Sequence, residues 1–134
     1  MLDMLHHLSL GVIDIERSAC FYDAALAALG YGRVWSDIRP GEQNQAVGYG
    51  KPGGGDELAL KQVADVPGDL PGFHVAFSAP SIAAVKQFHK AAVAAGGRDN
   101  GPPGLRPQYG PTYFAAFVVD PDGYRLEAVF NGDS

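Results

Sequence analysis

The stretch HHLSLGVIDIERSACFYDAALAALG (residues 6–30) decides the fold, because the chain repeats its pattern later. The stretch FHVAFSAPSIAAVKQFHKAAVAAGG (residues 73–97) aligns with it without a gap at a separation of 67 residues, so that His7 matches His74. In both copies a short apolar run precedes a helix-like segment that ends at glycine. This repetition predicts one supersecondary unit that occurs twice.

Each copy predicts one amphipathic helix after its first strand. Asp14 and Ser81 stand at the predicted N-caps, where a side-chain oxygen accepts a hydrogen bond from a free backbone N–H. Apolar residues follow at three- and four-residue spacing, which places them on one helix face toward a core. These residues are Tyr22, Ala25, Leu26 and Leu29 in the first copy and Val85, Phe88, Ala92 and Val93 in the second.

Further strands follow each helix. The predicted strands are residues 33–38, 46–50 and 58–63 in the first half and 112–119 and 124–130 in the second, with DPDG (120–123) as a hairpin loop. A strand at 98–100 is weakly signalled, and 100–111 is predicted to be a long loop that forms a lid or pocket wall. The fold class is therefore α+β: two βαβββ modules, about 1–66 and 67–134, in a single domain with the helices on the outer face.

Composition limits the function classes. A chain of 134 residues with 46% hydrophobic residues is long enough for one core. The net charge of −5, without a basic cluster, argues against nucleic acid and acidic membrane surfaces as partners, and no apolar run is long enough to cross a membrane. Cys20 is the only cysteine, which excludes an intramolecular disulfide and fits a cytoplasmic protein. We expect Cys20 to be a buried, inert thiol.

Strand alternation places three possible metal ligands on one sheet surface. His7 shares a face with Ser9, His74 with Ala76, and Glu127 with Arg125 and Val129, while the opposite faces are apolar and pack on the helices. Two imidazoles and one carboxylate with open positions suit one divalent ion, Zn, Fe, Mn, Ni or Co. His6 is expected on the opposite face, in a structural role.

Four other residues are candidates for substrate binding. Arg106 suits an anionic substrate group, and Tyr109, Tyr113 and Tyr49 suit a pocket wall. Pairing Val119 with Tyr124 across the hairpin would place Ala116 opposite Glu127, whereas a slip of one residue would turn Tyr113 inward. No general base or other catalytic residue is visible in the sequence.

The chain resembles the vicinal oxygen chelate superfamily, which contains glyoxalase I, fosfomycin-resistance proteins, bleomycin-resistance proteins and extradiol dioxygenases. The resemblance rests on the two repeated stretches and on the ending FVVDPDGYRLEAVF (117–130). It implies a curved, cup-like sheet with a metal inside, ligands at His7, His74 and Glu127, and a homodimer that sometimes exchanges modules. Glyoxalase I has a fourth, acidic ligand, but Leu60 and its neighbours carry no carboxylate. A three-ligand site is more like the fosfomycin-resistance and extradiol dioxygenase pattern.

The sequence therefore predicts a divalent-metal-dependent enzyme acting on a small substrate that chelates through oxygen. The resemblance leaves lyase, isomerase, transferase and ring-cleaving dioxygenase reactions open. An alternative is a metal-free protein of the bleomycin-resistance type that binds an antibiotic or metabolite, because the fold does not by itself imply catalysis.

Overall fold

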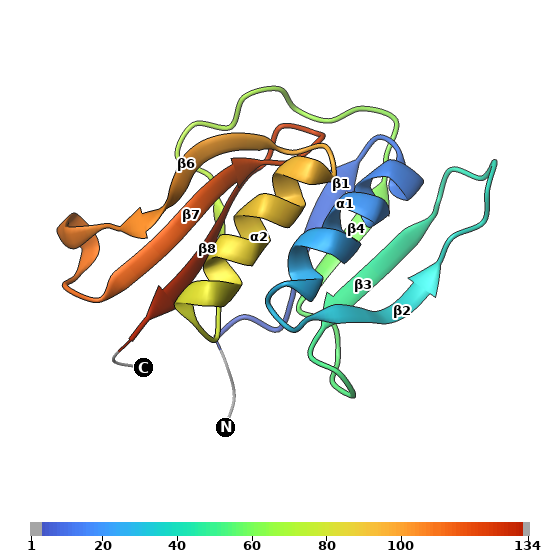
Figure 1. Cartoon of the computed structure of the whole chain (residues 1–134). Helices are drawn as coiled ribbons and strands as arrows, with labels where there is room; N and C mark the ends of the chain where they lie inside the picture. The colour runs from blue at the N-terminus through green and yellow to red at the C-terminus, as the bar shows by residue number, and fades with distance from the viewer. Residues whose placement is uncertain (1–3, 133–134) are drawn as a thin grey trace.

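The computed structural model describes residues 4–132 and contains two successive βαβββ units (Figure 1). The first unit comprises β1 (Leu8–Val12), α1 (Ile15–Ala27), β2 (Gly32–Asp37), β3 (Ala46–Gly50) and β4 (Leu58–Gln62). The second comprises β5 (Val75–Ser78), α2 (Ile82–Ala94), β6 (Arg98–Leu105), the 3-10 turn η1 (Pro107–Tyr109), β7 (Tyr113–Val119) and β8 (Arg125–Asn131). The predicted fold class is confirmed.

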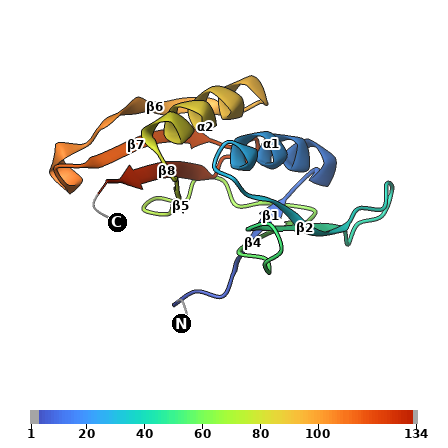
Figure 2. The ribbon, with the colours of Figure 1, turned by 60° about the horizontal axis from the view of Figure 1, so that its bottom comes forward.

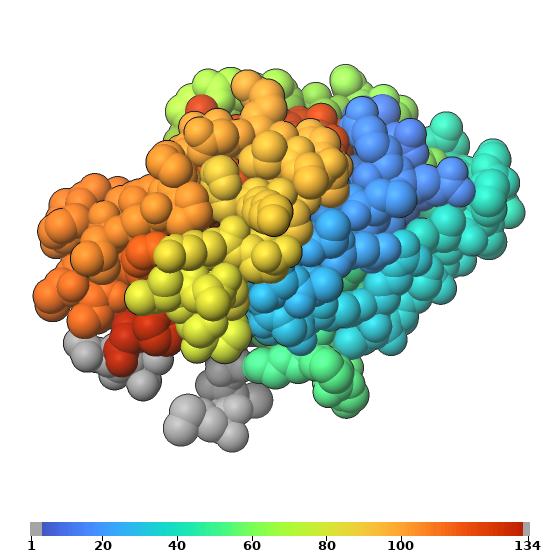
Figure 3. All heavy atoms as spheres, in the orientation of Figure 1, coloured from blue at the N-terminus to red at the C-terminus, as the bar shows by residue number. Residues whose placement is uncertain are grey.

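The two units form two four-stranded sheets of matching topology. The strand orders are β1-β4-β3-β2 and β5-β8-β7-β6, and the first strand of each unit pairs in parallel with its last. Both helices lie on the same side of the strands and contact each other (Figures 1 and 2). In the space-filling view of this side, the blue atoms of α1 meet the yellow atoms of α2 (Figure 3). Each sheet therefore has a helix-covered face and an opposite face, which we call its open face.

The helices begin where the sequence predicted. The Asp14 carboxylate accepts hydrogen bonds from the backbone N–H groups of Glu16 and Arg17, both at 3.2 Å, and the Ser81 hydroxyl oxygen accepts one from Ala84 at 3.1 Å. The predicted apolar stripes are buried, except that Val93 is 42% exposed. Each helix has 13 residues, and within residues 4–132 none is long and apolar enough to cross a membrane.

Two local predictions are wrong. The weakly signalled strand at 98–100 is confirmed, but it continues to residue 105 as β6 where a long loop was predicted. As an edge strand, β6 pairs only with β7, with register shifts on both sides of Gly101, so Pro102 and Pro103 can be accommodated. Cys20 is exposed, not buried, because it lies on the α1 face turned away from the core.

The loop between β7 and β8 fastens the second module to the first. Asp120 is only 4% exposed, and its carboxylate accepts a hydrogen bond from the Tyr22 hydroxyl at 2.5 Å. The same carboxylate accepts the backbone N–H groups of Asp122 and Tyr124 within its own loop. The Asp122 carboxylate accepts the Ser18 hydroxyl at 3.0 Å and pairs with Arg17 at 3.1 Å. Burial raises the pKa of the Asp120 carboxyl, and the Tyr22 hydrogen bond opposes that rise.

Replacing Tyr22 by Phe should destabilise the fold by about 1–3 kcal/mol at neutral pH, because a buried carboxylate oxygen loses its partner. In the folded protein the pKa of the Asp120 carboxyl is raised above its value of 3.8 in the unfolded chain. The contribution of the bound proton to the free energy of unfolding is therefore complete below pH 3.8 and declines as pH rises through the pKa of the folded state. The variant raises that pKa further, so its deficit should grow from acidic to neutral pH.

Urea unfolding of wild type and Tyr22→Phe, at an acidic pH and at neutral pH, measures this deficit in the free energy of unfolding. Tyr109→Phe is the matched control, because the Tyr109 side chain is 62% exposed. A deficit that is equal at both pH values would show that Tyr22 does not act through the Asp120 charge.

Candidate functional site

The open face of the second sheet is centred on Glu127. Phe117 lies opposite Glu127, and Val119 lies opposite Arg125, so the predicted pairing of Ala116 with Glu127 is wrong by one residue. The reason is the hairpin. The backbone N–H of Asp120 bonds to the Tyr124 carbonyl at 2.9 Å, which leaves three residues in the loop instead of four.

This register brings Tyr113 to Glu127, and the parallel pairing of β5 with β8 brings His74 there. His74 precedes β5, whose Ala76 pairs with Glu127, and the His74 Nε2 atom lies 3.0 Å from Glu127 Oε1. The Tyr113 hydroxyl donates to Glu127 Oε2. The Glu127 side chain is 3% exposed, whereas the His74 side chain is 50% exposed. Desolvation and the hydrogen bond to Glu127 raise the pKa of Tyr113 to about 12, so its hydroxyl remains a donor at neutral pH.

Two more predicted substrate-binding residues lie near this cluster. The Arg106 guanidinium lies over the Phe117 ring, 5.3 Å from its centroid, and donates to the Pro102 carbonyl at 2.6 Å. Gly101 permits this packing, because a Cβ there would lie 2.9 Å from the Phe117 ring. The Tyr109 ring lies 5.3 Å from the Tyr113 ring. A cation and two phenol rings therefore border the Glu127 cluster.

Tyr49 occupies a different place. It lies on the helix-covered face of the first sheet, is 1% exposed, and donates to the Asp23 carboxylate at 2.8 Å. Burial raises the pKa of its hydroxyl, and the hydrogen bond to Asp23 adds to the rise. Tyr49 also lines a cavity of about 230 Å³ that touches residues of both modules.

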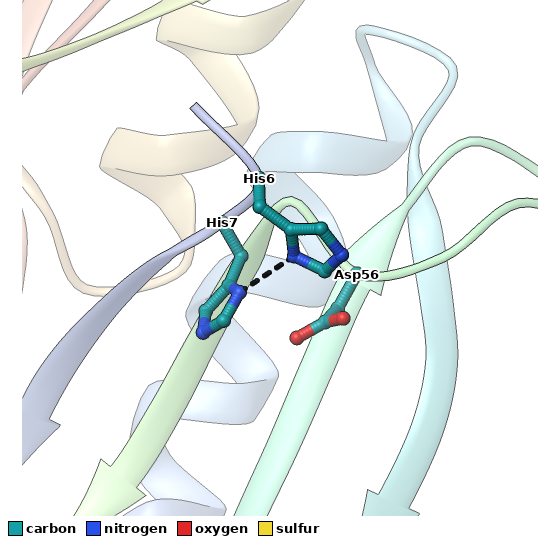
Figure 4. Close-up of side chains that lie close together, drawn as sticks. All are labelled: His6, His7 and Asp56. Carbon is teal, nitrogen blue, oxygen red and sulfur yellow. Dashed lines mark hydrogen bonds between the residues drawn. The ribbon is translucent and has the colours of Figure 1, made fainter. Parts of the chain in front are cut away.

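His7 lies with His6 and Asp56 at the end of the first sheet (Figure 4). The expectation that His6 points to the opposite face is wrong, because β1 begins only at Leu8 and the chain bends at His6. The two rings converge, with 2.8 Å between their Nδ1 atoms. Both histidines are exposed and Asp56 is half-buried.

The structure therefore joins His74 to Glu127 and places His7 apart from them. Within residues 4–132, the one group of three histidine, cysteine or acidic side chains whose ligand atoms all lie within 4.8 Å of one another is His6, His7 and Asp56. The register also identifies the first-module counterpart of Glu127. Ser9 pairs with Ala59 as Ala76 pairs with Glu127, so the matching position is Ala59, next to Leu60, and it carries no ligand atom.

The chemistry of the Glu127 cluster fits a divalent cation. The imidazole nitrogen and carboxylate oxygen are 3.0 Å apart, a spacing that suits two ligands each about 2.0–2.2 Å from one ion. Among the described residues, the carboxylate contacts the His74 ring and the Tyr113 hydroxyl and has no ion pair with lysine or arginine. A buried carboxylate without such a counter-charge favours a bound cation.

Paired βαβββ modules in this topology define a protein of the vicinal oxygen chelate type. The model of the Glyoxalase/Bleomycin resistance protein/Dioxygenase superfamily matches residues 4–128, and the chain belongs to that superfamily. No curated protein matches the chain in a sequence search.

Solved structures of several superfamily proteins are similar to the chain. A glyoxalase/bleomycin resistance protein from Albidiferax ferrireducens is 29% identical, with a TM-score of 0.75 and coverage of 95% of this chain and 98% of that one. Glyoxalase I from Zea mays is 26% identical, with a TM-score of 0.70. The match covers 95% of this chain and 46% of the maize chain. The fosfomycin resistance protein FosX from Listeria monocytogenes, at 17% identity, a TM-score of 0.68 and coverage of 96% and 93%, shares the fold.

Glu127→Gln should lower the pKa of Tyr113 from about 12, because the variant removes the charged acceptor. Burial remains, so the pKa should stay above the ordinary value of 10.0. The ring carbon resonance of Tyr113, followed by NMR in metal-free protein, measures the titration. Glu57→Gln, in the other module, should leave it unchanged, and an unchanged value in Glu127→Gln would contradict the assigned contact.

Proposed function

We propose that this protein is a divalent-metal-dependent enzyme that acts on a small substrate binding through oxygen atoms. The observation that carries the proposal is the contact between His74 Nε2 and the buried Glu127 carboxylate. Imidazole and carboxylate ligands suit Zn, Fe, Mn, Ni and Co, and a bound ion of this kind supplies Lewis-acid polarisation of a substrate oxygen.

His74 and Glu127 would hold the ion together with His7. Tyr113 fixes the carboxylate, since its hydroxyl occupies Glu127 Oε2 and leaves Oε1 toward His74. This partner outside the ligand set orients the ligand, as is common in metal sites. The three-ligand set leaves open positions for substrate.

Within one chain, the ligand atoms of His7, His74 and Glu127 do not all lie within 4.8 Å of one another. We infer a homodimer in which His7 of one copy joins His74 and Glu127 of the other. Two observations support this arrangement: β1 and β5 are edge strands with one free side each, and His7 and His74 precede these two strands. A twofold axis would create two identical sites.

The surroundings of Glu127 favour a substrate that carries an anionic group. Arg106 presents a cation beside Phe117, and Tyr109 and Tyr113 offer aromatic surfaces for the rest of the molecule. A single cysteine, Cys20, is compatible with the cytoplasm as the protein's compartment.

Elemental analysis of purified protein, dialysed to remove weakly held ions, tests the metal site. Wild type should carry near-stoichiometric metal, and His7→Ala, His74→Ala and Glu127→Gln should each lose most of it, because each removes or weakens a ligand. His89→Ala is the matched control, since His89 also contacts a carboxylate, that of Asp99 at 2.8 Å, on the helix side of the second module. Wild type that takes up no metal after reconstitution would contradict the enzyme proposal and favour a metal-free binding protein.

A mixture of His7→Ala and His74→Ala chains tests the shared site. Each variant alone should retain little metal after dialysis. After subunit exchange, a heterodimer has one site with both substitutions and one site with neither, so an equal mixture should recover about one quarter of the wild-type sites. Exchange is checked by native mass spectrometry. Heterodimers that form without any recovery would show that the ligands do not come from different copies.

A further inference from the structure

We propose that His6, His7 and Asp56 form a separate divalent-metal site, carried by a single chain. Figure 4 shows the two imidazole rings converging and the Asp56 carboxylate turned toward them. The site uses His7, which the proposed function also requires, so one His7 side chain serves only one of the two sites at a time. It uses neither His74 nor Glu127, so variants of those two residues isolate it.

Sheet register brings the three residues together. β1 and β4 pair in parallel with Leu8 opposite Leu58, so the residues just before each strand lie at the same end of the sheet. The Leu8 N–H bonds to the Glu57 carbonyl at 3.0 Å, which extends this pairing to the neighbours of His7 and Asp56. The turn before Asp56 folds back on β3, where a Cβ at Gly50 would clash with the Gly55 carbonyl oxygen.

The donor atoms are close enough for one ion. The ligand atoms of the three side chains lie within 4.8 Å of one another, and the two Nδ1 atoms are 2.8 Å apart. Two ligands each about 2.0–2.2 Å from an ion lie at most about 4.4 Å apart, so a small side-chain rotation completes the coordination. Both histidines are exposed, which leaves room for water in the remaining positions.

The Asp56 carboxylate is available as a ligand. Within residues 4–132 it takes part in no recorded hydrogen bond or ion pair, whereas its neighbour Glu57 lies 3.7 Å from the Lys51 ammonium group. Asp56 supplies a negative charge beside two imidazoles, a ligand set that suits Co²⁺, Ni²⁺ or Zn²⁺. A single chain can therefore hold an ion before a second copy joins it.

The test uses the full chain with His74→Ala and Glu127→Gln together, so that the Glu127 cluster cannot bind metal. Titration with Co²⁺, followed by visible absorption, should show one ion per chain, held weakly enough at this exposed site that dialysis removes it. Adding Asp56→Asn or His6→Ala should weaken Co²⁺ binding by more than the roughly tenfold that loss of a partner outside the ligand set costs, since the first weakens a ligand and the second removes one. Glu57→Gln is the matched control, because it neutralises the adjacent carboxylate and should leave the affinity unchanged.

NMR of the imidazole nitrogens with Zn²⁺ gives a second readout. The Nδ1 resonances of both His6 and His7 should shift on binding. The proposal is overturned if the double-variant background binds no Co²⁺, if Glu57→Gln weakens binding as much as Asp56→Asn, or if Zn²⁺ shifts only His7 Nε2. Failure of the enzyme proposal is separate: it appears as wild-type metal content that His74→Ala and Glu127→Gln do not change.

Discussion

The rest of the structure depends on the hydrogen bonds that the buried Asp120 carboxylate accepts. It accepts the Tyr22 hydroxyl from the first module and two backbone N–H groups of its own loop, so one buried group both docks the modules and fixes the β7–β8 turn. That turn sets the register that places Tyr113 beside Glu127. The packing of the modules and the geometry of the candidate site therefore depend on the same three-residue loop.

Most of the fold follows from local signals in the sequence. Asp14 and Ser81 cap their helices because short polar side chains satisfy free N–H groups close by in the chain. Strand 46–50 was predicted with its observed bounds. Of β6, only residues 98–100 carried a strand signal in the sequence. The two prolines and two glycines in the rest of the strand favour a loop, and pairing with β7 along a sheet edge outweighs that preference.

The candidate site was predictable only where strand alternation holds. Alternation brings His74 and Glu127 to one face, and the structure shows them in contact. It fails at His6, because the residue precedes the strand and lies in a bend. The position of Tyr113 was left open between two registers, since a slip of one residue exchanges the two faces of a strand and the loop sequence does not select between them.

The two modules share a fold but differ in the side chains that could bind a metal ion. The second module has its carboxylate within a strand, where Glu127 is covered by its neighbours and held by Tyr113. The first module has Ala59 at that position, and its nearby carboxylate, Asp56, comes before the strand and remains half-buried. An ion held by His6, His7 and Asp56 would dissociate readily into solvent. An ion held against the buried Glu127 carboxylate would be shielded from water, and electrostatic interactions are stronger in such a shielded site. Of the two positions, the Glu127 cluster is therefore the one suited to polarising a substrate.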